Sequence, residues 1–295
     1  MDQALGLRRK QDQQDHWESS STRPLSTRNH SIRVMTVSSG KGGVGKSNIV
    51  VNLALAFDRM GKKVLILDAD LGLANIDLLL GLTPKFNVSH VLSGAKKFRE
   101  VLVQGPGNIR IMPASSGVQQ LTQLTDEQKL LFLQMLEDVE AEIDVLLIDT
   151  AAGISDTVLY FNLAAQERII VVTPEPTSLT DAYALIKVLF VRHGERYFKV
   201  LANGVESERA GKVIFGNISK VAEHFLDGLS LDYLGSVPYD PNIPKAVLHQ
   251  SPLLGLFPDS PASMAISHVA GRIEKTCPHV NHGSIQFFWK RLLNI

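Results

Sequence analysis

The glycine-rich segment at residues 40–47 constrains the fold more than any other part of this 295-residue chain. It reads Gly-Lys-Gly-Gly-Val-Gly-Lys-Ser and follows a short apolar run, residues 33–38, that favours a β-strand. Residues 48–60 have helical apolar spacing and end before a glycine. A glycine loop between a strand and a helix lets backbone N–H groups converge on phosphate oxygens at a helix N-terminus. The sequence therefore predicts a phosphate-binding loop.

The loop carries two lysines where the ordinary loop has one. Lys46 and Ser47 occupy the usual positions, with the ammonium on the β/γ-phosphates and the hydroxyl on Mg²⁺. Lys41 is additional, and it comes so early in the loop that it is badly placed to reach its own nucleotide. We therefore expect it to reach a neighbouring nucleotide, in a nucleotide-dependent dimer. The predicted nucleotide-binding residues of the loop are Gly40, Lys41, Gly42, Gly43, Val44, Gly45, Lys46, Ser47 and Asn48.

Composition limits the function classes. Thirty basic residues balance thirty acidic ones, which gives no support to a broad nucleic-acid-binding surface, although a local patch stays open. The single cysteine, Cys277, excludes an internal disulfide and fits a reducing cytosol. No stretch approaches 18 uninterrupted apolar residues, and the polar N-terminus has no signal-peptide core. We expect a soluble, cytoplasmic protein.

Short apolar runs alternate with helical patterns along the chain. Continuous apolar strands separated by helices predict an α/β fold, a mostly parallel twisted sheet with helices on both faces. Ligands of such sheets bind beyond the carboxyl ends of the strands, where Asp68, Asp149 and Asn203 fall. A capping box also predicts a helix over residues 125–138. The expected strands are residues 33–38, 63–67, 109–112, 145–148, 168–173, 198–202 and 231–237.

Two acidic segments follow predicted strands, Asp-Ala-Asp at residues 68–70 and Asp-Thr-Ala-Ala-Gly at residues 149–153. A phosphate-loop NTPase needs a carboxylate at a strand end to hold Mg²⁺, and Asp149 fits this role. It also needs a group that orients the attacking water, which an aspartate of the first segment could supply. The alternative is that these aspartates only cap helices or form turns.

These motifs resemble those of the MinD/ParA family of deviant Walker A ATPases, over about residues 33–275. The resemblance implies ATP or ADP and Mg²⁺ as cofactors, and catalytic roles for Lys41, Lys46 and Asp70. Lys41 would contact phosphates across an ATP-sandwiched homodimer, and Asp70 would position the water. It further implies Mg²⁺ binding by Ser47 with Asp68 or Asp149. The adenine would lie beside Asn203 and a loop formed by Pro238, Tyr239 and Asp240. Asn48 departs from the family, since many relatives carry a threonine there.

The C-terminal segment, residues 284–295, has an amphipathic pattern. On a helix its large apolar side chains share one stripe beside Lys290 and Arg291, which suits an anionic membrane surface. The alternative is a helix packed on its own domain, and the two could alternate between nucleotide states. The predicted membrane-binding residues are Ile285, Phe288, Trp289, Leu292 and Leu293.

The polar N-terminal arm, residues 1–32, begins with a motif. Asp-Gln-Ala-Leu-Gly-Leu-Arg at residues 2–8 resembles the start of the FlhG (FleN) branch, MinD-like regulators of flagellar number. The resemblance implies stimulation of the GTPase FlhF, with Gln3 acting at the partner's catalytic centre, and further partners in a flagellar transcription activator and switch-ring proteins. A mere tail is the alternative. The predicted partner-binding residues are Asp2, Gln3, Ala4, Gly6, Leu7 and Arg8.

The expected layout is an arm over 1–32, an ATPase domain over 33–276, a linker over 277–283 and a membrane-targeting helix over 284–295. We expect an ATPase that is cytoplasmic and reversibly peripheral at the inner face of the cell membrane. Two alternatives are a division-site positioning ATPase of the MinD type and a DNA-partitioning ATPase of the ParA type. The single cysteine argues against an iron–sulfur reductase relative.

Overall fold

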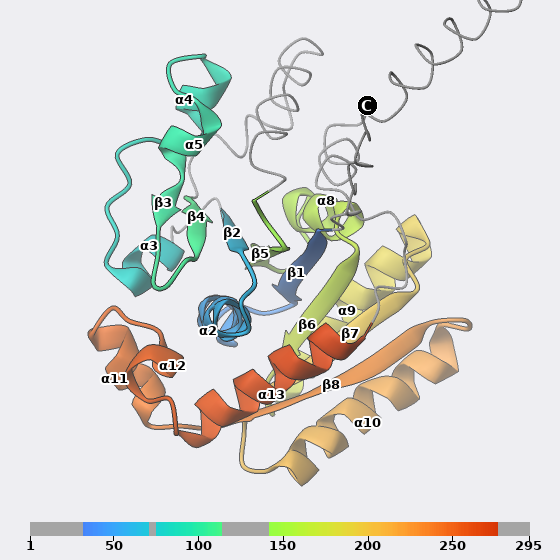
Figure 1. The fold of residues 1–295 in the computed structure, drawn as a ribbon. Helices are drawn as coiled ribbons and strands as arrows, with labels where there is room; N and C mark the ends of the chain where they lie inside the picture. Colours follow the sequence, from blue (N-terminus) through green and yellow to red (C-terminus); the bar gives the residue numbers. More distant parts are fainter. Residues whose placement is uncertain (1–31, 71–74, 114–141, 277–295) are drawn as a thin grey trace, which may run out of the picture. The chain divides into compact units, whose positions relative to one another are not determined.

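A computed structural model describes residues 32–70, 75–113 and 142–276, all of which belong to one compact unit, residues 31–295 (Figure 1). The helix expected over 125–138, the N-terminal arm, the linker and the C-terminal helix lie outside the described residues. None of the described helices is long and apolar enough to cross a membrane.

The described residues form an eight-stranded sheet in the order β3-β4-β2-β5-β1-β6-β7-β8. Every neighbouring pair is parallel except β3 and β4, which are antiparallel at one edge. The predicted mostly parallel α/β sheet is therefore confirmed. Each expected strand is present within a few residues, whereas β3 was not expected because two residues carry no periodic signal. The strands are β1 Arg33–Ser39, β2 Val64–Ala69, β3 Val103–Gln104, β4 Arg110–Met112, β5 Val145–Ala152, β6 Glu167–Val172, β7 Tyr197–Val205 and β8 Ser230–Pro238.

Helices cover both faces of this sheet (Figure 1). On one face α2 and α13 pack together over β1, β5 and β6, while α8, α9 and α10 pack on the other. Alternate residues of β1 show this division, because Met35 and Val37 join the first core and Val34 faces the second. Burial on both faces explains why the strands are continuously apolar. The helices are α2 Lys46–Arg59, α3 Asn75–Leu80, α4 Val88–Leu92, α5 Phe98–Val101, α8 Asp156–Ala164, α9 Pro176–His193, α10 Glu208–Phe225, α11 Asn242–Leu248, α12 Leu253–Leu256 and α13 Pro261–Lys275.

An ionic cluster fastens the start of β1 to the end of α13. Arg33 and Lys199 both form ion pairs with the buried carboxylate of Glu167. Burial acts to raise the pKa of Glu167, but the two cations outweigh it and hold the pKa below its usual range. Arg33 also donates to the Ile273 carbonyl oxygen and, over 3.2 Å, to the Thr276 hydroxyl. Both ends of the described domain therefore meet at the amino edge of the sheet.

Candidate nucleotide site

The phosphate-binding loop has the predicted strand–loop–helix setting. It joins the end of β1 to the start of α2, and Gly43 and Gly45 adopt φ values of 78° and 90°. At Gly45 a β-carbon would also stand 2.5 Å from Nδ2 of Asn203, so both backbone conformation and space require glycine. At Gly40 a β-carbon would lie 2.1 Å from the backbone of Asp181 in α9, so the loop begins in direct contact with that helix.

An open cavity of about 630 Å³ lies over this loop. Lys46, Ser47 and Asn48 line it from the start of α2, Asp70 from the end of β2, and Val247 from α11. Loop residues and an acidic residue that are far apart in the chain thus share one cavity at the carboxyl edge of the sheet. This is the edge where parallel α/β sheets bind ligands.

Lys46 and Asp149 form the buried charged centre of the site. Burial lowers the pKa of Lys46, while Asp149 and Asp70 act to raise it. Burial raises the pKa of Asp149 to about 6, although the Ser47 hydroxyl and the Lys46 ammonium both act to lower it. Within the described residues neither carboxylate oxygen of Asp149 has a hydrogen-bond partner of standard geometry. Buried oxygens without a partner, beside a serine hydroxyl, fit a hydrated Mg²⁺ ion.

Asp68 has different surroundings from Asp149. It is completely buried, and its two oxygens accept from the backbone N–H groups of Asp70, at 3.1 Å, and Ile76, at 3.3 Å. Its carboxyl group therefore braces the start and end of the segment that carries Asp70. Of the two aspartates proposed for Mg²⁺, the geometry favours Asp149.

Asp70, the expected water-orienting residue, lines the cavity. Its Oδ2 accepts from Nδ2 of Asn75 at 3.2 Å. Asn75 is the first residue of α3, so the start of this helix holds the Asp70 side chain.

Lys41 turns away from the cavity. Its ammonium forms an ion pair with Glu175 and donates to Oγ1 of Thr177 at 2.9 Å. Both partners stand at the start of α9, Glu175 as the helix cap. The lysine thus contacts α9 and does not line the cavity over the phosphate loop. Contacts of Lys41 with Glu175 and Thr177 were not predicted, because contact between a loop and a helix 134 residues later leaves no local signal.

Asn203 lies under the phosphate loop at the end region of β7. Its Nδ2 donates to the Val44 carbonyl at 2.8 Å, and its Oδ1 is buried with no partner in the described part of the chain. Pro238 pairs with Val205, and the Tyr239 N–H donates to the Val205 carbonyl at 2.9 Å, so this loop runs beside the Asn203 strand. The Tyr239 side chain is 71% exposed.

Asp240 uses its carboxylate within the protein. It accepts from the backbone N–H groups of Asn242, at 2.9 Å, and Ala262, at 3.2 Å. Burial acts to raise its pKa, but hydrogen bonds from Asn242, Ser260 and Ala262 hold the pKa below its usual range. The Asp240 carboxylate therefore connects α11 to α13.

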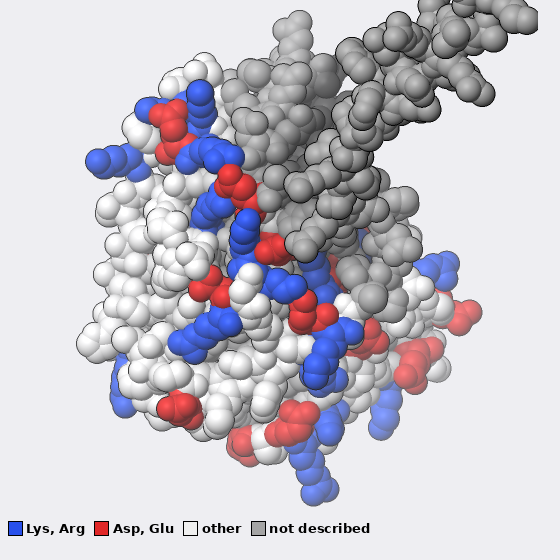
Figure 2. Space-filling model, viewed as in Figure 1, with Lys and Arg blue, Asp and Glu red and all other residues white. Residues whose placement is uncertain are grey.

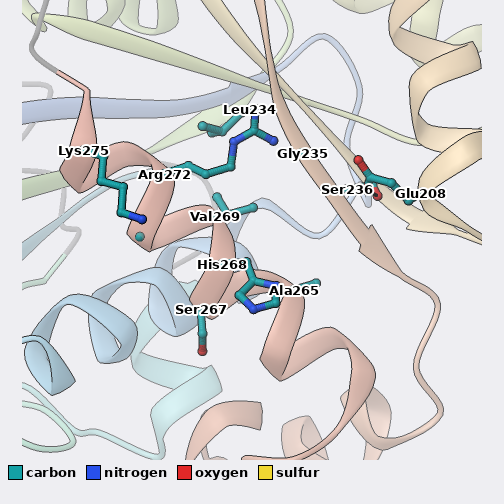
Figure 3. A pocket seen from close by; sticks show the side chains of 11 residues that line it. Glu208, Leu234, Gly235, Ser236, Ala265, Ser267, His268, Val269, Arg272 and Lys275 are labelled. Atoms are coloured by element: carbon teal, nitrogen blue, oxygen red, sulfur yellow. Dashed lines mark hydrogen bonds between the residues drawn. The ribbon is translucent and has the colours of Figure 1, made fainter.

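A second cavity, of about 610 Å³, lies at the β8 edge of the sheet, between β8, α13 and the start of α10 (Figure 3). Figure 3 shows the Arg272 side chain extending from α13 toward Gly235. Arg272 donates to the Tyr233 carbonyl at 3.1 Å, and the β7–β8 register shifts beside Gly235. A bulge and a covering cation protect an edge strand from pairing with other chains. This cavity shares no lining residue with the nucleotide site.

Comparison with known proteins identifies the family. Residues 31–274 match the ParA family model, described as the NUBPL iron-transfer P-loop NTPase. The chain belongs to the ParA/MinD family of P-loop NTPases. It is 47% identical to the antiactivator FleN of Pseudomonas aeruginosa, across 90% of this chain and 94% of FleN. It is 32% identical to the flagellum site-determining protein YlxH of Helicobacter pylori, across 88% of this chain and 90% of YlxH.

A solved structure agrees with this assignment. The septum site-determining protein MinD of Pyrococcus horikoshii, in complex with Mg-ADP, is 25% identical with a TM-score of 0.65, across 83% of this chain and 96% of MinD. These relatives place the chain in the FleN/FlhG branch and make it an ATPase, as its motifs predict.

Proposed function

We propose that this ParA/MinD-family ATPase is a switch that binds ATP with Mg²⁺, dimerises around the nucleotides and regulates flagellar number or placement. The observation that carries this proposal is the position of Lys41. The phosphate loop is otherwise complete, yet this lysine lies on Glu175 and Thr177, outside its own site. A cation held beside the phosphate loop, outside the cavity that Lys46 lines, is available to the phosphates of a second copy.

Hydrolysis in this site depends on positioning and electrostatics. The loop amides and Lys46 would hold the phosphates, and Asp70, held by Asn75, would orient the attacking water. Ser47 and Asp149 would hold Mg²⁺, which would supply positive charge against the negative charge that develops during phosphoryl transfer. Asn203 would contact the adenine: its buried Oδ1 needs a donor, and the exocyclic amine of adenine is one. Pro238, Tyr239 and Asp240 would border the base.

The flagellar role and the partners rest on the relatives and on the terminal motifs. The names FleN antiactivator and flagellum site-determining protein support a flagellar regulator. The proposed partners are an FlhF-type GTPase, through residues 2–8, and a flagellar transcription activator and switch-ring proteins. The amphipathic pattern over 284–295 supports reversible binding to the inner face of the cell membrane from the cytoplasm.

Division-site positioning and DNA partitioning are the competing functions. The equal numbers of acidic and basic residues disfavour DNA partitioning, as does Figure 2, where both charge signs are interspersed on the face shown. The 47% identity to FleN and the N-terminal motif disfavour division-site positioning.

Two experiments test the proposal. In the first, light scattering of the full chain should show an ATP-dependent dimer that ADP does not support. In the presence of ATP the dimer should co-sediment with anionic liposomes. Deletion of residues 284–295 should abolish this co-sedimentation while the dimer still forms. In the second, flagella are counted in cells lacking the protein. An excess supports the proposal, whereas normal flagella with a division or plasmid-loss defect contradict it.

A further inference from the structure

The pairing of β5 with β1 is interrupted immediately after Asp149. Val37 pairs with Asp149, but Ser39 pairs with Ala152, so Thr150 and Ala151 of β5 together face the single residue Ser38 of β1. This is a β-bulge, which is rare between parallel strands. A bulge bends its strand and changes the direction of neighbouring side chains, and bulges are frequent beside active sites. Here it lies next to the carboxylate assigned to Mg²⁺.

A buried polar network holds this bulge. The Thr150 hydroxyl donates to Oγ of Ser38 at 2.9 Å, and Nδ2 of Asn162 donates to the same Oγ at 2.9 Å. Asn162 also donates to the Val158 carbonyl at 2.8 Å, and its Oδ1 accepts from the Thr36 hydroxyl at 3.0 Å. The four polar side chains are at most 1% exposed. A fully bonded network in a low-dielectric interior is rigid.

Asn162 connects three segments of the site through this network. It belongs to α8, Ser38 lies two residues before the start of the phosphate loop, and Thr150 directly follows Asp149. Apart from the nearby Ser47 hydroxyl and Lys46 ammonium, neither Asp149 oxygen has a hydrogen-bond partner of standard geometry in the described residues, so the direction of the carboxylate depends largely on the β5 backbone. That backbone is fixed to β1 at the bulge, and Gly153 N–H donates to the Ser39 carbonyl at 2.9 Å beyond it.

We propose that Asn162 is a positioning residue for ATP hydrolysis. Through Ser38 and Thr150 it fixes the bulge that directs Asp149 toward Mg²⁺, and it sets the spacing between the phosphate loop and residues 150–153. The alternative is that Asn162 has only a structural role and satisfies buried polar groups beneath α8. That alternative does not explain why its amide meets the residues flanking both the loop and Asp149. The inference rests on the proposed role of Asp149 in Mg²⁺ binding.

The test compares two equally buried asparagines. Asn162→Leu should lower kcat by about 10-fold or more. It should also reduce the Mg²⁺ effect, meaning the increase in nucleotide affinity that Mg²⁺ provides, by a similar factor, as changes to groups supporting metal ligands do. ADP affinity in EDTA, measured by calorimetry, should stay within about twofold, because the phosphate loop is untouched. The control is Asn52→Leu, which removes a 1% exposed amide bonded to the Asn48 carbonyl and the Leu254 N–H. It should lower Tm but leave the Mg²⁺ effect unchanged.

Thr150 supplies an independent pair of variants, which decides the question if Asn162→Leu fails to fold. Thr150→Ser keeps the hydroxyl and should keep the wild-type kcat and Mg²⁺ effect, whereas Thr150→Val should lose both. Wild-type values in Asn162→Leu or Thr150→Val would overturn the proposal, and so would an equal loss in Asn52→Leu. A separate variant tests whether Asp149 binds Mg²⁺ at all. If it does not, Asp149→Asn will show the same Mg²⁺ effect as the wild type.

Discussion

Asp68 and Asp149 are register partners on neighbouring parallel strands, β2 and β5, so two buried carboxyl groups occupy the same level of the sheet. Burial, and secondarily the Asp149 charge, raises the pKa of Asp68 to about 8. Burial raises the pKa of Asp149 to about 6. Asp68 is therefore positioned to stay protonated near neutral pH, while Asp149 carries the charge available to a cation.

This pair predicts an unusual pH dependence of stability in the absence of Mg²⁺ and nucleotide. Folded Asp68 keeps its proton up to about pH 8, whereas in the unfolded chain it ionises near its ordinary pKa of 3.8. Because the folded state then binds one more proton at Asp68, the free energy of unfolding falls as pH rises from about 4 to 8, and this group contributes at most about 1.4 kcal/mol per pH unit. Asp68→Asn should flatten this slope, as measured by urea denaturation in EDTA. An unchanged slope would show that Asp68 titrates normally.

The contact between Lys41 and the start of α9 predicts a tunable dimer. Glu175→Gln removes the ion pair, so the lysine should transfer more easily to a second copy and lower the ATP concentration needed for dimerisation by a few-fold, on the order of one surface ion pair. Lys41→Ala should abolish ATP-dependent dimerisation while monomer nucleotide binding persists. Light scattering with ATP measures both, and a Lys41→Ala chain that still dimerises would refute the role of this lysine.

Asn203 predicts coupling between base recognition and the phosphate loop. Asn203→Asp keeps the side-chain shape but replaces the donor to the Val44 carbonyl with an oxygen, which would repel that carbonyl. We expect ATP affinity to fall by about 10-fold or more, since an unmatched buried polar group costs about 1–3 kcal/mol. Calorimetry with ATP and GTP checks this. If the variant binds ATP like the wild type, Asn203 supports neither the loop nor the base.

The two left-handed glycines of the loop predict different costs for the same substitution. Gly43→Ala adds a β-carbon with nothing within 4 Å. Without nucleotide, its free energy of unfolding should therefore fall only by the cost of the backbone strain, about 1–2 kcal/mol. Gly45→Ala adds the same strain and a contact of 2.5 Å with Asn203. It should therefore lower the free energy of unfolding further than Gly43→Ala, in urea denaturation without nucleotide. Equal losses would mean that the Asn203 amide moves aside freely.

The fold was predictable because its strands are buried on both faces. Runs such as residues 145–148 are apolar throughout, and the intervening helical patterns leave few arrangements other than a parallel sheet. The phosphate loop was equally predictable, since glycines at fixed offsets meet a steric demand that Gly45 illustrates. The strand ends were less so: β5 continues to Ala152, past the expected end at Ile148, because its last residues pair across a bulge.

The features of the site that could not be predicted from the sequence are contacts between distant segments of the chain. Asn162 is a single polar residue within the apolar run of α8, and only the fold shows that its amide meets Ser38 of β1. Asp240 shows a second kind of unpredicted contact, because its carboxylate accepts hydrogen bonds from the backbone N–H groups of Asn242 and Ala262. Neither the Lys41 nor the Asn203 contact is encoded in local spacing, so motif positions indicated which residues matter without indicating what they touch.

The hydrogen bond between Arg33 and Thr276 has a practical consequence for protein engineering. It joins the first strand to the end of the last described helix, so a few residues could bridge these two ends. The ATPase domain should therefore tolerate circular permutation, with new termini opened in an exposed loop such as that around Gly228. Such a permuted domain would retain the nucleotide site while separating it from both native tails, so that either tail could be reattached alone.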